Sequence, residues 1–327
     1  MTRLGYQIPN FNYPGVGPGE LFDSVAAQAA AADRSGFDTV LLMDHFYQLP
    51  MLGDPDAYML ECYTTLGALA RETSTVRLGA LVTGNTYRNP AVLAKIVTTL
   101  DVISGGRAQL GIGAGWFELE HDALGVEFGT FTDRFAKLEE ALQIILPMLS
   151  DERPTFEGAH YWVRDAINQP APLGRIPIMI GGSGEKKTLR LVAQYADESN
   201  LTSGIDEIPR KLDALAGHCE RLGRDRSEIT VTQQLNVCVA ETHDAAYSDV
   251  AGFLARRGMD VSTMDDELRD QIMSMVVWGD SDEVGDRLSA ILDSGIDGFT
   301  CNMVANGFDP ERVEQLGAVA RSVLDRR

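Results

Sequence analysis

The sequence contains no long uninterrupted hydrophobic run. None of its apolar segments approaches the roughly 20 residues that a membrane-spanning helix requires, so no transmembrane segment is predicted. The N-terminal residues MTRLGYQIPNF lead directly into a predicted strand, and no targeting signal is expected there. We therefore expect a cytoplasmic protein with no membrane partner.

Positive charge is also scarce. The chain has 28 Lys and Arg against 48 Asp and Glu, which gives a formal net charge of −20. Because this field repels nucleic acids and anionic membranes, neither is expected as a partner. A small anionic cofactor is still compatible with the composition, since a few backbone amides and one or two lysines outweigh a distant field at contact range.

Cysteine is rare and its spacing carries no pattern. The four cysteines show no CxxC or other ligand spacing, and each lies in a predicted helix or strand; they are Cys62, Cys219, Cys238 and Cys301. Buried, reduced thiols are the expected state. No pair of histidines or carboxylates has the spacing of metal ligands either, so no metal site is expected.

What the sequence does contain is an alternation of short apolar runs with longer amphipathic stretches, which predicts repeated β-α units and a parallel sheet. Eight strands are predicted, which is the number in a closed (β/α)8 TIM barrel. They cover residues 4–8, 38–43, 76–83, 107–112, 176–181, 197–202, 228–238 and 297–303. The fold class is therefore α/β.

Amphipathic segments separate the predicted strands, and several of them end in a glycine suited to a helix C-cap. The predicted helices lie within residues 19–37, 58–74, 89–106, 131–149, 185–197, 208–223, 243–258, 281–295 and 309–324. Although 327 residues suggest two domains, barrels run to about 250 residues or more as one unit, so a single domain over 1–327 is predicted.

Two segments exceed the minimal barrel. Residues 151–175 are rich in turn signals around a short YWV run, which predicts a small hairpin after the fourth strand-helix unit. Residues 260–276 predict an extra helix over the last strands. We expect both excursions at the C-terminal face of the strands, where insertions shape the rim of a pocket.

The segments after the predicted strands are unusual in composition. Asn10 and Phe11 follow the first strand and Phe46 lies just after the second, so these three are expected in a substrate pocket. The fifth strand runs into Gly181-Gly182-Ser183-Gly184-Glu185-Lys186-Lys187. Glycines between a strand and a helix let the backbone approach an anion, which predicts a phosphate site. The alternative is a tight turn that uses glycine for its geometry alone.

A glycine-rich motif and the histidines are further candidate site features. GIGAGW at 111–116 is not the full GxGxxG and follows the fourth strand, so it favours close approach to a flat ring over dinucleotide binding. His45 follows the buried run TVLLMD, where a histidine donates to a ring atom or transfers a proton, unless it is purely structural. His121 is expected to be a rim or helix residue; no role is assigned to His160, His218 or His243.

Together these segments resemble the luciferase-like monooxygenase superfamily, and within it the coenzyme F420-dependent oxidoreductase branch. The resemblance covers nearly the whole chain. The segments that carry it are GYQIPNF, SGFDTVLLMDHF, RLGALVTGNTYRNPAVLAK, SGGRAQLGIGAGW, RFAKLEEALQII and IPIMIGGSGEKKTLRLVAQYADESN.

The resemblance implies functions for individual positions. His45 is similar to the residue beside the deazaflavin ring, and the third strand is expected to carry a non-proline cis peptide, placed by position at Ala80–Leu81. His45 and Trp116 are the predicted catalytic residues. The predicted cofactor-binding residues are Asp44, His45, Ala80, Leu81, Val82, Thr83, Asn85, Gly113, Ala114, Gly115, Trp116, Gly181, Gly182, Ser183, Gly184, Glu185 and Lys186.

The chain departs from one pattern of this branch. Some relatives that oxidise sugar phosphates have a glutamate just after the fourth-strand glycines, where this chain has Trp116. The substitution removes the acid of such a mechanism, and an aromatic wall suggests a more apolar small-molecule substrate.

The function expected from the resemblance is hydride transfer between the deazaflavin C5 of F420 and a small organic substrate, with reduction of an activated C=C or C=N favoured. Two alternatives stay open: an FMN-dependent monooxygenase that uses O2 and a partner flavin reductase, and a flavin- or deazaflavin-binding barrel without turnover. The segments YTTLGALA and AVLAKIV are apolar on more than one face, which fits either a homodimer interface or burial against neighbouring helices.

Overall fold

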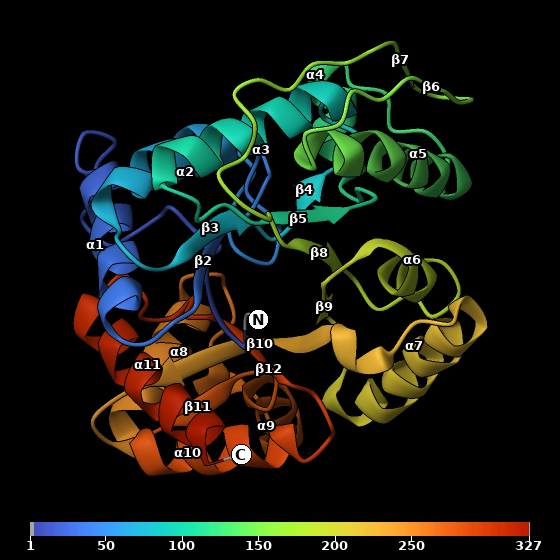
Figure 1. The fold of residues 1–327 in the computed structure, drawn as a ribbon. Coiled ribbons are helices and arrows are strands. Elements are labelled where there is room, and N and C mark those ends of the chain that lie inside the picture. The colour runs from blue at the N-terminus through green and yellow to red at the C-terminus, as the bar shows by residue number, and fades with distance from the viewer. Residues whose placement is uncertain (1–2, 327) are drawn as a thin grey trace.

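The computed structural model describes residues 3–326, and its centre is a closed barrel of parallel strands. Figure 1 shows the strands at the centre with helices around them. The strands are β1 (Leu4–Ile8), β2 (Thr39–Leu42), β3 (Arg77–Ala80) with its continuation β4 (Thr83–Gly84), β5 (Leu110–Gly113), β8 (Ile178–Gly181), β9 (Glu198–Leu201), β10 (Thr230–Val239) and β12 (Gly298–Asn302). The predicted TIM barrel is confirmed; residues 1, 2 and 327 of the predicted span lie outside the described residues.

Strand pairing closes the ring in two places. β1 pairs in parallel with both β2 and β12, which joins the first barrel strand to the last. A parallel bridge between Leu78 and Ala108 joins β3 to the segment before β5, and β4 continues that pairing beside β5. Because all these strands are parallel, their C-terminal ends form one mouth, where side chains far apart in sequence meet.

The helices cover the outside of the barrel. They are α1 (Leu21–Arg34), α2 (Cys62–Glu72), α3 (Pro90–Ser104), α4 (Glu118–Leu124), α5 (Phe131–Leu149), α6 (Thr188–Tyr195), α7 (Ile208–Leu222), α8 (His243–Ala255), α9 (Asp266–Met273), α10 (Ser281–Leu292) and α11 (Pro310–Asp325). Several begin at caps visible in the sequence: the Asn89 side chain accepts from the amides of Ala91 and Val92, and Thr130 forms a capping box with Asp133. The large hydrophobic core lies between these helices and the strands and joins the two ends of the chain, Leu4 and Leu324.

The third barrel strand differs in detail from its prediction. It is interrupted after Ala80, and the non-proline cis peptide lies at Leu81–Val82, one bond later than the predicted Ala80–Leu81. The reason is the hydrogen bonding: the Leu81 amide still donates to the Leu42 carbonyl at 2.8 Å, so the pairing with β2 extends through the Leu81 N–H.

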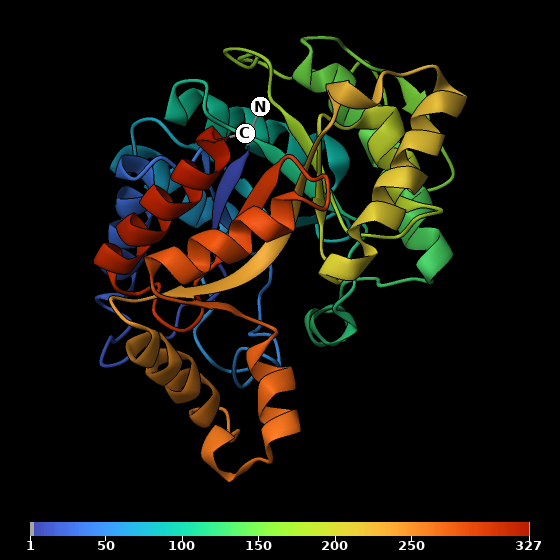
Figure 2. The same cartoon turned by 90° about the horizontal axis from the view of Figure 1, so that it is seen from below.

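The two excursions have different structures. Segment 151–175 contains the antiparallel pair β6 (Phe156–Glu157) and β7 (Trp162–Val163). Segment 260–276 contains a short 3-10 turn (Val261–Thr263) and then α9, and it leads into a strand that the sequence did not predict, β11 (Val277–Gly279), which pairs with the end of β10. Figure 2 shows α8 and α9 projecting together from the barrel; Phe253 and Met273 belong to the separate apolar cluster between them.

All four cysteines are buried and free of disulfides, as predicted. Burial raises the pKa of Cys238 and Cys301 to about 12, so these thiols stay protonated at neutral pH. Among the described residues no group of His, Cys, Asp and Glu is arranged to hold a metal ion. No helix within residues 3–326 combines the length and the apolar character needed to cross a membrane.

Candidate active site

A cavity of about 580 Å³ lies at the C-terminal mouth of the barrel. Half of its lining was predicted from sequence: Asp44, His45, Leu81, Val82, Thr83, Gly115, Trp116, Gly181 and Gly182. The other half was not: Gln7, Met43, Leu49, Met51, Gly84, Tyr87, Asn200, Thr202 and Gln234. We call this space the main cavity.

His45 follows β2 and faces the main cavity with its side chain 13% exposed. Its Nδ1 lies 3.0 Å from Oε2 of Glu120, a residue of α4. An ionised carboxylate only accepts hydrogen bonds, so Nδ1 carries a proton and donates a hydrogen bond to Glu120. This leaves Nε2 as the ring nitrogen available to a ligand.

Glu120 is fully buried and receives three hydrogen bonds besides that from His45. The amides of Phe46 and Tyr47 donate to its Oε1 at 2.6 and 2.8 Å, and the Tyr87 hydroxyl donates to its Oε2. Burial by itself raises the pKa of Glu120, but the bonds from His45, Tyr87 and the Tyr47 amide bring it below its ordinary value. Glu120 therefore stays ionised at neutral pH and fixes both the tautomer and the position of His45.

Aromatic rings hold His45 from its other sides. The rings of Trp116 and Phe117 each meet the imidazole edge-on, with centroids 5.7 Å away. Trp116 is 55% exposed and stands at the rim of the main cavity, whereas Phe117 is buried. Trp116 can thus cover a ligand that lies beside His45.

Asp44, the neighbour of His45, is held by a buried ion pair. Arg88 Nη1 lies 2.6 Å from Asp44 Oδ2 and Nη2 lies 2.9 Å from Oδ1, in a two-pronged arrangement. Arg88 also donates to Glu61 at 2.8 Å and stacks on the Tyr63 ring, and the Tyr63 hydroxyl is 2.6 Å from that of Thr83. This network fixes the loop that carries His45.

Val82 projects into the main cavity between two glycines. A Cβ on Gly113 would lie 2.8 Å from Val82 Cγ2, and one on Gly181 would lie 2.8 Å from Val82 Cγ1. No real Cβ tolerates such distances without a shift of its neighbour. The glycines that end β5 and β8 are therefore required by the packing of Val82, which the sequence interpretation, based on cofactor contact alone, did not anticipate.

The turn after β8 supplies free amides. Gly182 has φ +116°, a conformation that favours glycine, and its amide donates to the Asn200 carbonyl at 2.9 Å. The amides of Gly184, Glu185 and Lys186 donate to no acceptor within residues 3–326. They precede the first turn of α6, so they form the kind of cluster that accepts an anion.

The side chains of this turn differ in their roles. Glu185 turns toward α7, where its Oε1 lies 2.9 Å from Lys211 Nζ and 3.2 Å from Arg210 Nη1, so it is already paired within the protein. Ser183 Oγ accepts from the Thr202 amide at 2.8 Å. Lys186 is exposed and can pair with an anion, whereas Lys187 lies over the rings of Phe131 and Phe135.

The floor of the main cavity is polar. Gln234 donates to Gln7 at 2.8 Å, and Gln7 donates to the Leu81 carbonyl at 2.8 Å. Asn200 donates from Nδ2 to two threonine hydroxyls, each at 3.0 Å, but its buried Oδ1 has no hydrogen-bond partner in the described part of the chain. A buried acceptor without a partner at the edge of a cavity is suited to an N–H or O–H of a ligand.

Several predicted site residues do not reach the main cavity. Asn10 lies in a second cavity beside it, Phe11 is fully buried in the core, and Phe46 packs against the Tyr87 ring with centroids 5.0 Å apart. Ala80, Asn85, Gly113, Ala114 and residues 183–186 are likewise outside its lining. The prediction for Phe11 was wrong because its apolar ring packs in the main core, where it gains more from burial than it would in a wet pocket.

His121 lies in α4, as a predicted rim or helix residue, but it is buried rather than at the rim. Its Nδ1 is 2.8 Å from the Phe117 carbonyl, so Nδ1 donates there, and Nε2 accepts from the Thr86 hydroxyl at 2.7 Å. It therefore holds α4, and with it Glu120, against the loop that carries Tyr87. The sequence could have signalled Gln7 and Gln234, polar residues within apolar strands, but nothing local separates Glu120 from a surface glutamate such as Glu118.

Comparison with known proteins shows the family to which the chain is similar. The family model described as luciferase-like monooxygenase matches residues 2–298. An F420-dependent glucose-6-phosphate dehydrogenase of Microbacterium testaceum (strain StLB037) is 34% identical over 248 residues, which cover 75% of this chain and 70% of the relative.

Solved structures share the fold at lower identity. The coenzyme F420-dependent tetrahydromethanopterin reductase of Methanopyrus kandleri superposes with TM-score 0.76 and 20% identity, over 98% of this chain and 99% of that one. An EDTA monooxygenase from Chelativorans sp. BNC1 superposes with TM-score 0.81 and 17% identity, over 99% and 94% of the two chains.

Proposed function

The chain belongs to the luciferase-like monooxygenase family, and on this premise we propose that it is a coenzyme F420-dependent oxidoreductase. The observation that carries the proposal is His45, which is fixed by Glu120 at the edge of a cavity into which Val82 projects. The similarity to relatives named as F420-dependent dehydrogenases supports F420 over FMN.

The residues present fit this cofactor. The main cavity gives a flat ring a support in Val82, and the Asn200 Oδ1 without a partner can accept from a ring N–H. The free amides of residues 184–186 and the exposed Lys186 can hold the acidic tail. Gly113 and Gly181 leave Val82 the space that this arrangement needs.

When bound, F420 supplies a carbon that gives up or accepts a hydride. The protein's part is to place the substrate beside His45 in the main cavity, with Trp116 at the rim, and to supply or accept the proton that accompanies the hydride. His45 Nε2 is the atom that holds or releases this proton, while Nδ1 keeps its hydrogen bond to Glu120. We propose reduction of an activated C=C or C=N, in which His45 protonates the substrate atom next to the one that receives the hydride.

Cofactor choice is tested by anaerobic titration of the purified protein with each candidate. We expect F420 to quench protein fluorescence with a Kd in the micromolar range, and FMN to bind at least tenfold more weakly. Tighter binding of FMN, followed by O2-dependent turnover with a flavin reductase, would contradict the proposal. Binding of F420 without turnover of any candidate substrate would instead support a barrel that only carries the cofactor.

We further propose that the chain forms a homodimer through α2 and α3. Val92 and Ile103 of α3 are 54% and 40% exposed, and both line one hollow formed by residues of α2 and α3. A contiguous apolar surface of this kind is typical of a protein interface. Light scattering after gel filtration should give about twice the chain mass of 35.6 kDa. The double substitution Val92→Glu and Ile103→Glu should halve this mass, and an unchanged mass would place the interface elsewhere.

A further inference from the structure

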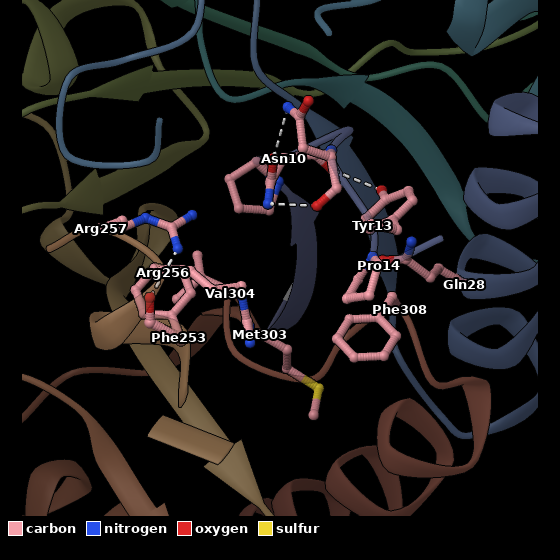
Figure 3. Close-up of a pocket in the computed structure, with 12 residues that line it drawn as sticks. Asn10, Tyr13, Pro14, Gln28, Phe253, Arg256, Arg257, Met303, Val304 and Phe308 are labelled. Carbon is pink, nitrogen blue, oxygen red and sulfur yellow. Dashed lines mark hydrogen bonds between the residues drawn. The ribbon is translucent and has the colours of Figure 1, made fainter. Parts of the chain in front are cut away.

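A second cavity, of about 250 Å³, lies beside the main one at the mouth of the barrel. Figure 3 shows Tyr13 and Phe308 on one side of it and Arg256, Arg257 and Phe253 on the other. The first pair comes from the segments after β1 and β12, and the second group from the end of α8. We call this space the arginine cavity.

The arginine cavity carries positive charge without a counter-charge. None of the residues that line it is an Asp or Glu, although the chain has 48 of them. Arg256 is exposed and forms no ion pair within residues 3–326. Two adjacent cations at an acid-free hollow in a strongly acidic protein are an arrangement that attracts an anion.

Arg257 is held in place with a donor to spare. Its Nη1 donates to the Phe253 carbonyl at 3.0 Å and its Nη2 to the Leu52 carbonyl, while the guanidinium stacks 3.6 Å from the centroid of the Phe253 ring. Its Nε is buried and has no hydrogen-bond partner among the described residues. A guanidinium has five N–H donors, so several remain for a ligand.

The charge of Arg257 is only partly compensated by its surroundings. Burial, and then the nearby charge of Arg256, lower the pKa of Arg257 to about 10. Arg257 is still charged at neutral pH, but its charge is partly desolvated and unpaired, which is costly unless an anion is bound. A carboxylate or phosphate would supply that partner.

Shape restricts the ligand further. Aromatic rings from Tyr13, Phe253 and Phe308 form the walls, and the volume is below the roughly 300–1,000 Å³ of sites for drug-sized ligands. Such a space suits a flat ring with one anionic group, or one end of a larger molecule.

The arginine cavity and the main cavity share a wall. Leu49 and Met51 line the main cavity, whereas the Leu52 carbonyl is bonded to Arg257. Gln48, which is fully buried, donates to Asn10 of the arginine cavity at 3.2 Å. Residues 48–52 therefore separate the place of hydride transfer from the two arginines.

We propose that the arginine cavity binds a carboxylate or phosphate attached to a small flat ring, at a site separate from the main cavity. Arg256 and Arg257 bind the anionic group, and Tyr13, Phe253 and Phe308 enclose the ring. This assignment does not depend on the proposed function.

The test compares ligands of equal shape and different charge. Benzoate, phenyl phosphate and neutral benzamide are titrated by calorimetry into the full-length protein without cofactor, at low salt. We expect at least one anion to bind tenfold or more tightly than benzamide. Arg256→Ala should weaken that anion about tenfold, the effect of one charge-assisted contact, and leave benzamide within twofold. Arg164→Ala, on the exposed excursion, should change neither.

Arg256→Ala is the decisive variant because the Arg256 side chain forms no hydrogen bond or ion pair within residues 3–326, whereas Arg257→Met also removes the bonds to Leu52 and Phe253. Anions that bind no better than benzamide, or equally well to Arg256→Ala, would overturn the assignment. Titration of the same proteins with F420 keeps the two proposals separate. If anions bind and F420 does not, the proposed function alone is contradicted. If F420 binds and the anions do not, the anion site alone is contradicted.

Discussion

Replacement of His45 by asparagine is expected to lower kcat by about 10²–10⁴-fold, the usual range for loss of a positioned proton donor. Asparagine keeps a hydrogen-bonding side chain toward Glu120 but has no titrating group at the position of Nε2. The Kd for F420 should change less than tenfold, because Val82, Asn200 and the amides after β8 are untouched. Single-turnover oxidation of reduced F420 under anaerobic conditions measures the rate, and fluorescence quenching measures the Kd.

Variants of the supporting residues separate proton transfer from simple packing. Glu120→Gln should lower kcat by about 10–100-fold, as loss of the partner that orients a reacting histidine does, and should shift the pH profile of kcat. Tyr87→Phe removes one donor to Glu120 and leaves the His45 contact, so its profile should keep the wild-type midpoint. Wild-type rates in His45→Asn would exclude His45 from the chemistry.

Arg88→Met is expected to lower the free energy of unfolding by about 3–5 kcal/mol, the typical result of removing one partner from a buried ion pair. Asp44 is 3% exposed and would then keep only the Gly84 amide as a partner, at 3.1 Å. Urea unfolding, followed by circular dichroism, measures the loss. A loss below about 1 kcal/mol would mean that water reaches Asp44 when Arg88 is absent.

The same variant should have a distinctive pH dependence. Burial raises the pKa of Asp44, and in the wild type the bonds from Arg88 counteract that effect. Without Arg88 the folded protein holds a proton that the unfolded chain releases above about pH 4, so stability should fall as the pH rises. The deficit at pH 8 should therefore exceed that at pH 5. The double variant Arg88→Met and Asp44→Asn removes the unpaired charge and should recover part of the loss at pH 8.

Local sequence pattern predicts the position of most strands but not how they pair. The predicted strand at 4–8 coincides with β1, and the prediction at 297–303 differs from β12 by one residue at each end, because a run of buried residues between turn signals is a local property. The third strand was predicted as one unit over 76–83, yet it divides into β3 and β4. That division depends on pairing with β2 on one side and β5 on the other, which no single segment encodes.

The residues of the site also fall into those that the sequence predicts and those that it does not. His45, Trp116 and the glycines after β8 follow strands directly, so the chain order alone brings them to the mouth of the barrel. Glu120, Arg88 and Arg257 do not follow strands in this way. Each acts through a partner far away in sequence, respectively His45, Asp44 and the Leu52 carbonyl.

The sequence by itself determined the barrel and the family, because apolar periodicity and strand-end motifs are written in consecutive residues. Only the tertiary structure decided that Glu120 is buried against His45, that Val82 requires Gly113 and Gly181, and that Arg256 and Arg257 share a cavity without an acid. The physical reason is that a charge or a methyl group has its effect through the atoms within a few ångströms of it. For these residues those atoms belong to other strands and helices.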